Sequence, residues 1–164
     1  MIKKRFEESL ILRLITLGER LKRRRDIICQ NLGISTQQWL ILLYLAQDPN
    51  IEFWKNGEHK KPLLASELAD ALNVSRPNIT NIINILMEKG LVEQVDDDED
   101  KRRKRLVLSV AGKILLESLQ PHRELLNSSL FSNLKQEQKE DFLQIVESCM
   151  EVLDQQIENE TRKQ

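Results

Sequence analysis

Apolar residues recur at steps of three and four near the start of the chain, which is the pattern of an amphipathic helix. The series consists of Phe6, Leu10, Leu14, Leu17 and Leu21. It predicts one long helix from about residue 5 to Asn31. Gly33 is a typical stop signal at the end of a helix, and Ser35 is a typical cap for a second helix over Thr36–Ala46.

The helical pattern then breaks over residues 47–62. Asp48, Pro49 and Asn50 are typical turn residues, so we expect a long loop. Phe53 and Trp54 lie inside it. The simplest interpretation is an apolar plug that fastens the loop to the domain, and the alternative is a ligand pocket or a partner contact.

The next part of the chain predicts two short helices followed by two short strands. The first helix covers Leu64–Leu72 and is ended by Asn73. The second begins after Ser75, whose side chain is expected to accept a hydrogen bond from the amide of Asn78, and it runs to Lys89. Pro77 is tolerated in its first turn, and Gly90 suits the left-handed position after its end. The strands are expected over Leu91–Val95 and Arg105–Ser109.

Two further helices complete the prediction. The first extends from Val110 to about Phe131 and is expected to be interrupted by a kink at Pro121, where the ring removes a backbone donor. The second extends from Lys135 to about Asn159. Its apolar face consists of Phe142, Ile145, Val146, Cys149, Val152, Leu153 and Ile157. The predicted fold class is therefore mainly α (α+β), with long terminal helices around a small helix–strand region.

Composition agrees with a globular chain. The 164 residues are 40% hydrophobic and 31% charged, which suffices for one domain with a hydrophobic core. No apolar run approaches the length of about 18 residues that a membrane span needs. Glu7 and Glu8 follow the basic N-terminus, which disfavours a signal peptide, so we expect a cytoplasmic protein without a membrane partner.

The residues that catalysis or metal binding would need are sparse. The two histidines, His59 and His122, and the two cysteines, Cys29 and Cys149, are not spaced as metal ligands, and no nucleophile motif or glycine-rich phosphate loop is present. We therefore expect no enzyme activity, no metal and no cofactor. Two reduced thiols are the simplest interpretation of the cysteines, with a redox switch as the alternative.

The charges are strongly segregated although the net charge is only −1. An acidic run over residues 96–100 leads directly into a basic run over residues 101–105. Because nucleic-acid binding needs local rather than net positive charge, the basic run is a candidate contact surface.

The predicted helix after Ser75 has two distinct faces. Its inner face is apolar, with Ile79, Ile82, Ile83 and Leu86, whereas its outer face carries Arg76, Asn78, Thr80, Asn81 and Asn84. Amide, hydroxyl and guanidinium groups are those that pair with base edges in the major groove. Two helices joined by a tight turn are typical of a helix-turn-helix, and the hairpin with Lys101, Arg102 and Arg103 at its tip can reach a minor groove. An ordinary surface helix and a protein-interaction module without DNA binding remain alternatives.

These motifs resemble the MarR (multiple antibiotic resistance regulator) family. The resemblance rests on Leu68-Ala69, Asn73 to Pro77, Leu86 to Val92, Asp100-Lys101-Arg102, Leu108-Ser109 and Gly112. It implies a winged helix-turn-helix in which Asp100 braces the wing and Arg102 enters the minor groove. The expected DNA-binding residues are Ser75, Arg76, Pro77, Asn78, Thr80, Asn81, Asn84, Asp100, Lys101, Arg102, Arg103 and Lys104.

The sequence departs from the family pattern at four places. Leu64 stands where a Ser or Thr cap is common, Asn81 where a basic residue is common, and Lys101 where the first Arg of the wing is frequent. The loop over residues 47–62 is also longer than usual. The identity of the base contacts is thus the part that the resemblance leaves open.

The length of the terminal helices predicts a dimer. A helix of this length spans about 40 Å, more than a small winged helix can cover, so its apolar stripe needs a second copy; a monomer with paired terminal helices is the alternative. We expect residues 1–46 and 110–164 to form the dimerisation region and residues 47–109 the DNA-binding lobe, within one structural domain.

The resemblance further implies a homodimer that binds a near-palindromic operator in double-stranded DNA, as a ligand-responsive repressor. Its effector would be a small aromatic or phenolic compound. Candidate ligand-binding residues are Arg13, Trp39, Tyr44 and His122. A redox-responsive regulator of the same fold that acts through Cys29 is the alternative.

Overall fold

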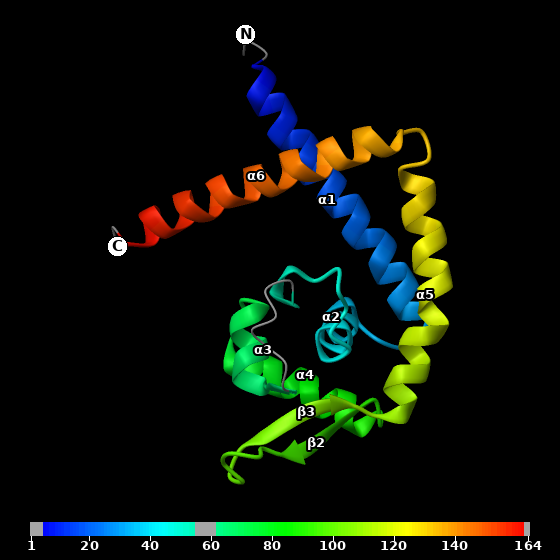
Figure 1. Ribbon diagram of the computed structural model, residues 1–164, viewed down its shortest axis with the longest axis vertical. Helices are drawn as coiled ribbons and strands as arrows, with labels where there is room; N and C mark the ends of the chain where they lie inside the picture. The colour runs from blue at the N-terminus through cyan, green and yellow to red at the C-terminus, as the bar shows by residue number, and fades with distance from the viewer. Residues whose placement is uncertain (1–4, 55–61, 163–164) are drawn as a thin grey trace. The chain divides into compact units, whose positions relative to one another are not determined.

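The computed structural model of the protein describes residues 5–54 and 62–162 (Figure 1). It contains α1 (Phe6–Asn31), α2 (Thr36–Leu45), a short 3-10 helix η1 (Glu52–Trp54), β1 (Leu63–Leu64), α3 (Ala65–Ala71), α4 (Arg76–Glu88), β2 (Val92–Asp96), β3 (Lys104–Leu108), α5 (Val110–Leu130) and α6 (Gln136–Thr161). The predicted mainly α class, with a small sheet after the first four helices, is confirmed.

The chain divides into two compact units. The first ends at Glu117 and contains α1–α4, the sheet and the first two turns of α5. The second begins at Ser118 and contains the rest of α5 together with α6. The helix-turn-helix and the strands therefore belong to the first unit, and each unit is described separately.

The sheet of the first unit has three antiparallel strands in the order β1-β3-β2. Strands β2 and β3 form the predicted hairpin, with Val92 opposite Leu108 and Asp96 opposite Lys104. The turn of this hairpin projects from the lobe (Figure 1). Strand β1 was not predicted, because the expected helix started at Leu64. Two residues are too short to show a strand period, and their pairing with β3 depends on chain that lies far away in sequence.

Three helices of the first unit end in left-handed residues at the expected places. Gly33, Asn73 and Gly90 have φ values of 68°, 50° and 67°. After α4, the amide of Gly90 donates to the carbonyl of Met87, and the amide of Leu91 donates to that of Leu86. This pair of bonds satisfies the last carbonyls of the helix and lets the chain turn directly into β2.

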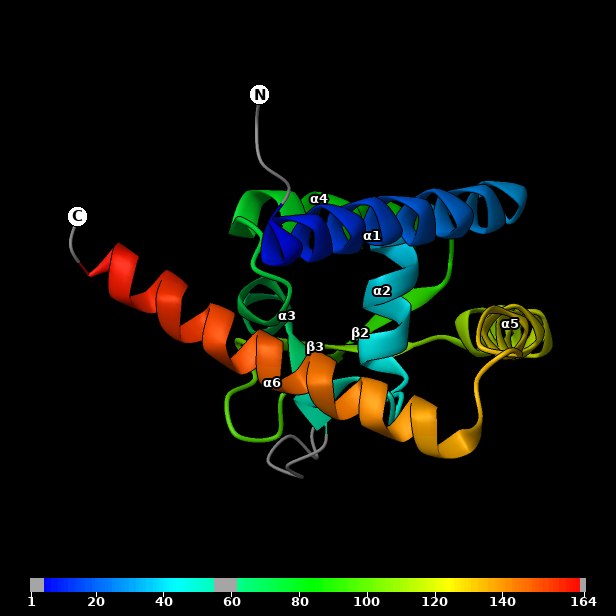
Figure 2. The same cartoon turned by 90° about the horizontal axis from the view of Figure 1, so that it is seen from above.

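The core of the first unit joins α2 to the winged-helix elements. Its buried residues include Ile41 and Leu42 of α2, Leu68 of α3, Leu86 of α4 and Leu106 of β3. Helix α2 runs across α1 (Figure 2) and packs on α4 and β3. The core therefore joins α3, α4 and β3 to the end of α1.

The loop after α2 is fastened to this core by aromatic rings. Phe53 lies 5.5 Å from Tyr44 and 5.0 Å from Trp54, measured between ring centroids. Both loop aromatics are half-buried against the core, which confirms the apolar plug. The amide of Asn50 donates to Asp48 at 2.9 Å, as expected for a turn at this point.

In the second unit, the rings of Phe131 and Phe142 lie 6.5 Å apart where α5 turns into α6. None of the residues of α6, all of which the structure describes, is buried. Helix α5 continues through Pro121, from Val110 to Leu130, so the expected interruption is absent, and a kink at the proline stays a prediction. Within residues 5–54 and 62–162, no helix combines the length and the apolar content that a bilayer crossing requires.

Gly112 explains how the first turn of α5 fits against the end of α4. A Cβ atom at this position would lie 2.2 Å from the carbonyl oxygen of Leu91, which is backbone and cannot swing away. The hydroxyl of Ser109 fixes the same junction, since it donates to the carbonyl of Gly90 at 2.6 Å and accepts from the amide of Gly112 at 3.0 Å.

We therefore expect Gly112→Ala to destabilise the protein by about 1–3 kcal/mol, because the added methyl group overpacks a backbone contact. Gly18→Ala is the matched control: nothing lies within 4 Å of its added Cβ, and alanine in a helix interior is favoured over glycine by up to about 1 kcal/mol. Urea unfolding of the two variants measures both effects. Equal stability of the Gly112 variant and the wild type would contradict this packing.

Candidate nucleic-acid interface

Helix α4 presents the two faces that its sequence predicts. Ile79, Ile82, Ile83 and Leu86 are buried. The polar residues of the other face are all exposed, namely Arg76, Asn78, Thr80, Asn81 and Asn84. The hydroxyl of Thr80 donates to the carbonyl of Arg76 at 2.8 Å, so its oxygen can still accept a bond from outside. The exposed face therefore offers amide donors and acceptors on a helix that the core holds firmly.

The start of α4 corrects one prediction. Ser75 is the N-cap residue and has extended backbone angles, but its side chain makes no capping hydrogen bond. Pro77 occupies the second helical position and has no N–H, so one of the two amides that a cap can bond is absent. The Ser75 side chain is exposed instead.

The turn between α3 and α4 is tight. Asn73 adopts the left-handed conformation, and the amide of Val74 donates to the carbonyl of Ala69 at 3.0 Å. At the other end of α3, Leu64 is the N-cap residue, as expected, and it offers no polar side chain. Glu67 takes over part of this role, since its carboxylate accepts from the amide of Leu64 at 2.7 Å.

At the tip of the hairpin, Asp100 holds Arg102. The carboxylate of Asp100 accepts from the backbone amide of Arg102 at 3.0 Å and from its Nε and Nη2 at 3.1 Å and 3.2 Å. These bonds with Arg102 lower the pKa of Asp100. The side chain of Arg102 is nevertheless 91% exposed. Such an arrangement presents an oriented guanidinium to the surroundings, as predicted for a wing.

The remaining basic residues of the hairpin have different environments. Arg103 is exposed, and its Nε lies 3.8 Å from Asp100. Lys104 forms an ion pair with Asp96 across the two strands and is also exposed. Lys101 is exposed at the tip. The structure therefore brings Lys101, Arg102, Arg103 and Lys104 together on one projecting turn.

Two charged residues that the sequence analysis did not select stand at the base of this turn. Asp97 is only 2% exposed, and Arg105 has 12% of its side chain exposed. Arg105 donates to the carboxylate of Asp97 and, at 2.6 Å, to the carbonyl of Pro62. A further nitrogen–oxygen distance of 3.7 Å joins it to Glu67. A single guanidinium thus contacts the hairpin, the segment before β1 and the first turn of α3.

Asp97 also shapes the turn itself. Its carboxylate accepts from the amides of Glu99 and Asp100, both at 2.9 Å. An aspartate that bonds amides two and three residues ahead is ordinary turn chemistry, but a run of five acidic residues does not show which of them makes these bonds. Its partner Arg105 could not be identified from the sequence either, because the pairing depends on the strand register.

The four candidate ligand residues have separate surroundings. Arg13 is exposed on α1, and His122 is exposed in the second unit. Trp39 lies under the guanidinium of Arg25, 5.7 Å from the ring centroid. Tyr44 packs on Phe53. An effector site built from these residues stays a prediction.

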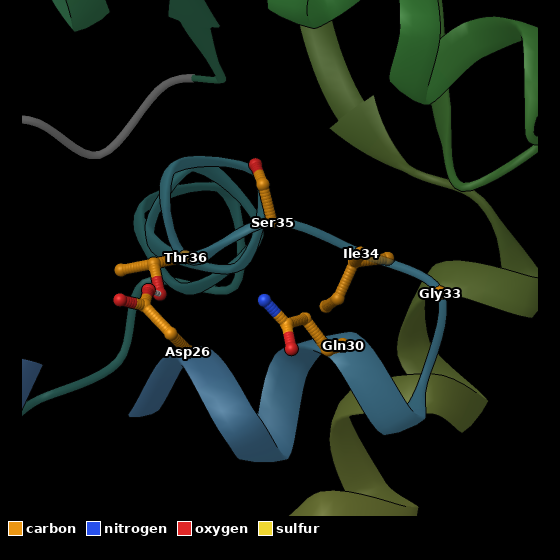
Figure 3. Close-up of a pocket in the computed structure, with 6 residues that line it drawn as sticks. All are labelled: Asp26, Gln30, Gly33, Ile34, Ser35 and Thr36. Carbon is orange, nitrogen blue, oxygen red and sulfur yellow. Dashed lines mark hydrogen bonds between the residues drawn. The ribbon is translucent and has the colours of Figure 1, made fainter. Parts of the chain in front are cut away.

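A pocket of about 340 Å³ lies instead where α1 meets α2 (Figure 3). The hydroxyl of Thr36 donates to the carboxylate of Asp26 at its edge. The residues that line the pocket are Asp26, Gln30, Gly33, Ile34, Ser35 and Thr36. None of the candidate ligand residues is in this set.

The cysteines differ in exposure, and both are free thiols. Cys29 is buried in the core, and this burial raises the pKa of its thiol despite a hydrogen bond with Thr36 and the nearby charge of Arg25. A protonated, buried thiol reacts slowly, which disfavours the redox alternative. Cys149 is exposed on α6.

Of the two histidines, His59 lies outside the described residues.

One further contact ties α4 to the corner between α1 and α2. The Nζ atom of Lys89 donates to the carbonyl of Gly33, and it lies 3.3 Å from the side-chain oxygen of Gln38. Gln38 is buried, and the same oxygen accepts from the amide of Ser35 at 3.0 Å. The C-terminal end of α4 is therefore attached to the corner at the end of α1.

A tight helix pair, a polar exposed face on the second helix and a basic β-hairpin define a winged helix-turn-helix of the transcription-regulator class. Residues 32–103 match the model of the MarR family. The transcriptional repressor MprA of Escherichia coli is 27% identical over 92% of this chain and 80% of its own length, and the repressor YetL of Bacillus subtilis is 26% identical over 88% and 81%. Over residues 32–103, which contain the helix-turn-helix and strand β2, the chain belongs to the MarR family, and its curated relatives are transcription regulators rather than enzymes.

Solved structures agree on the fold. A complex of Staphylococcus aureus MepR with DNA superposes with a TM-score of 0.68, at 22% identity, over 92% of this chain and 99% of that one. A MarR protein from Peptoclostridium difficile has a TM-score of 0.69 at 22% identity, over 98% and 94%. The predicted winged helix-turn-helix is thereby confirmed.

The surroundings of Asp97 predict how stability depends on pH. Hydrogen bonds from Asp100, Arg105 and Glu99 lower the pKa of its carboxyl to about 2, although burial alone would raise it. A depressed pKa in the folded state contributes stability above the ordinary value of 3.8, and this contribution is lost as the pH falls toward about 2.

We expect Asp97→Asn to unfold at lower urea concentration than the wild type at neutral pH. The difference in free energy of unfolding between the variant and the wild type should narrow steadily as the pH falls from about 5 toward the depressed pKa of Asp97. Asp98→Asn is the control at an exposed position and should change the free energy of unfolding by no more than about 0.5 kcal/mol. A difference for Asp97→Asn that is constant over the whole range would refute this account of the carboxylate.

Proposed function

We propose that the protein is a ligand-responsive repressor that binds a near-palindromic DNA operator as a homodimer. Helix α4 enters the major groove, and the tip of the β2–β3 hairpin reaches the neighbouring minor groove. The DNA-binding residues are those expected from the sequence, on α4 and on the hairpin tip. Such a regulator works in the cytoplasm of a bacterium, where its operator lies.

The exposed polar face of α4 is the observation that carries this proposal. Asn78, Asn81 and Asn84 point away from the core on a helix whose opposite face is buried. Asparagine pairs with adenine through two hydrogen bonds, and arginine pairs similarly with guanine. The centre of a protein-binding patch is typically enriched in aromatic and other apolar side chains, which this face of α4 lacks, so the interaction-module alternative is not favoured.

Exposed apolar side chains support the homodimer. On α1, Leu10 and Leu14 are 46% and 49% exposed, and on α6, Val152 and Leu153 are 52% and 54% exposed. Exposing apolar stripes of this length to water is unfavourable. A second copy of the chain, related by two-fold symmetry, covers them with the same helices. Two recognition helices then meet successive major grooves about 34 Å apart. The dimerisation region proposed for residues 1–46 and 110–164 contains both stripes.

Binding to duplex DNA should be tight and strongly salt-dependent. The operator sequence is first obtained by selection from random-sequence DNA. A plot of the logarithm of the binding constant against the logarithm of the salt concentration should then have a negative slope of about 0.9 for each phosphate contact. Arg102→Ala should weaken binding to all sequences and reduce this slope by about 1, whereas Asn78→Ala should change the sequence preference. Fluorescence anisotropy measures both.

Arg162→Ala is a matched control for charge, because Arg162 is exposed after α6 and pairs only weakly with Glu158, at 3.4 Å. It should bind as the wild type does. If the wild type shows no salt-dependent binding to any duplex in dilute buffer, the proposed function is wrong.

The dimer should separate when its apolar stripe becomes charged. Leu10→Glu combined with Leu14→Glu places two like charges on each copy of the stripe, so sedimentation should show a monomer where the wild type is a dimer. Operator affinity should fall with it, because the two half-sites are no longer bound together. A variant that sediments as a dimer would exclude α1 from the interface.

A further inference from the structure

A continuous chain of polar contacts runs from the start of α3 to the tip of the hairpin. Glu67 accepts from the amide of Leu64 at 2.7 Å and lies 3.7 Å from Arg105. Arg105 donates to the carbonyl of Pro62 at 2.6 Å and to the carboxylate of Asp97. This first half of the chain connects the helix-turn-helix to the base of the hairpin.

The second half leads from Asp97 to Arg102. The carboxylate of Asp97 holds the amides of Glu99 and Asp100, each at 2.9 Å. Asp100 in turn holds the backbone amide of Arg102 at 3.0 Å and its guanidinium at 3.1 Å and 3.2 Å. Because each acceptor orients the next residue, the direction of the Arg102 side chain depends on Asp97.

We propose that the buried Asp97–Arg105 ion pair is a positioning pair for DNA recognition: it fixes the direction in which Asp100 presents Arg102 relative to α4. This inference rests on the proposed function. Neither member of the pair touches DNA itself, because both side chains are buried or nearly so at the base of the turn.

The choice of partner suits this role. A guanidinium has five N–H donors in a rigid plane, so Arg105 can bond the hairpin, the segment before β1 and α3 at once. A lysine is a point charge and cannot keep all three directions. Arg105 therefore fixes the position of the wing relative to α3, and α3 packs on α4.

The sign of one mutational effect separates positioning from simple electrostatics. Removing a carboxylate near DNA ordinarily strengthens binding, because it reduces repulsion from the phosphates. If Asp97 orients Arg102, its removal must weaken binding instead. Asp98 is the matched control, since it carries the same charge one residue away and is exposed.

The experiment is a double-mutant cycle with Arg102→Ala on three backgrounds: wild type, Asp97→Ala and Asp98→Ala. Anisotropy with the labelled operator duplex gives the affinities, and circular dichroism confirms that each variant is folded at the assay temperature. We expect Arg102→Ala to cost about tenfold in affinity on the wild-type and Asp98→Ala backgrounds, but less than about twofold on the Asp97→Ala background.

We also expect Asp97→Ala alone to weaken binding at least about threefold, while Asp98→Ala binds as tightly as the wild type or more tightly. The proposal is overturned if Asp97→Ala strengthens binding, or if Arg102→Ala costs the same factor on all three backgrounds. If the pair only stabilised the fold, its loss would reduce the number of folded molecules, but each folded molecule would still use Arg102 fully. Arg102→Ala would then cost the same factor on all three backgrounds.

If Asp97→Ala does not fold, Arg105→Lys replaces it in the same cycle. This variant keeps the charge but loses the planar fork, and it should again reduce the cost of Arg102→Ala. Lys89→Met serves as its control, because it removes a cationic contact at the far end of α4 and should leave the full cost of Arg102→Ala.

Amide hydrogen exchange in the absence of DNA distinguishes a failure of the positioning proposal from a failure of the proposed function. Asp97→Ala should speed exchange at the amides of Glu99, Asp100 and Arg102, whereas Asp98→Ala should not. Faster exchange together with a wild type that ignores DNA refutes the function but not the link within the wing. Unchanged exchange refutes the link whatever the DNA binding.

Discussion

The carboxylate of Asp97 is buried in the winged-helix lobe, and a buried charge is stable only when hydrogen bonds and an opposite charge surround it. This constraint determines much of the lobe. Arg105 must remain next to Asp97, so β3 must keep its register, and the hairpin turn must bring two amides to the carboxylate. The position of the wing follows from these requirements rather than from the length of the hairpin.

Most of the fold could be predicted because its helices carry local signals. The end of α1 at Gly33, the turn at Asn73 and the end of α4 at Gly90 each depend on a residue that tolerates the left-handed conformation. Strand β1 could not be predicted in this way. It consists of two residues, and what makes them a strand is their pairing with Leu106 and Arg105, more than 40 residues away.

The exposed parts of the candidate site could also be predicted, whereas its internal connections could not. The polar face of α4 follows from helical periodicity, and the basic hairpin tip is visible as a run of charge. Asp97 is hidden in that same run, because five consecutive acidic residues look alike until the turn buries one of them. The position of Ser75 at the N-cap could be predicted as well, but the capping hydrogen bond expected from its side chain is not made.

The ammonium group of Lys89 couples two helices mechanically. It binds the corner at Gly33 and Gln38, so the C-terminal ends of α4 and of α1 share one point of attachment. A tilt of α1 relative to α4 strains these two contacts. If α4 reads DNA as proposed, a force that moves α1 therefore also acts on the orientation of α4.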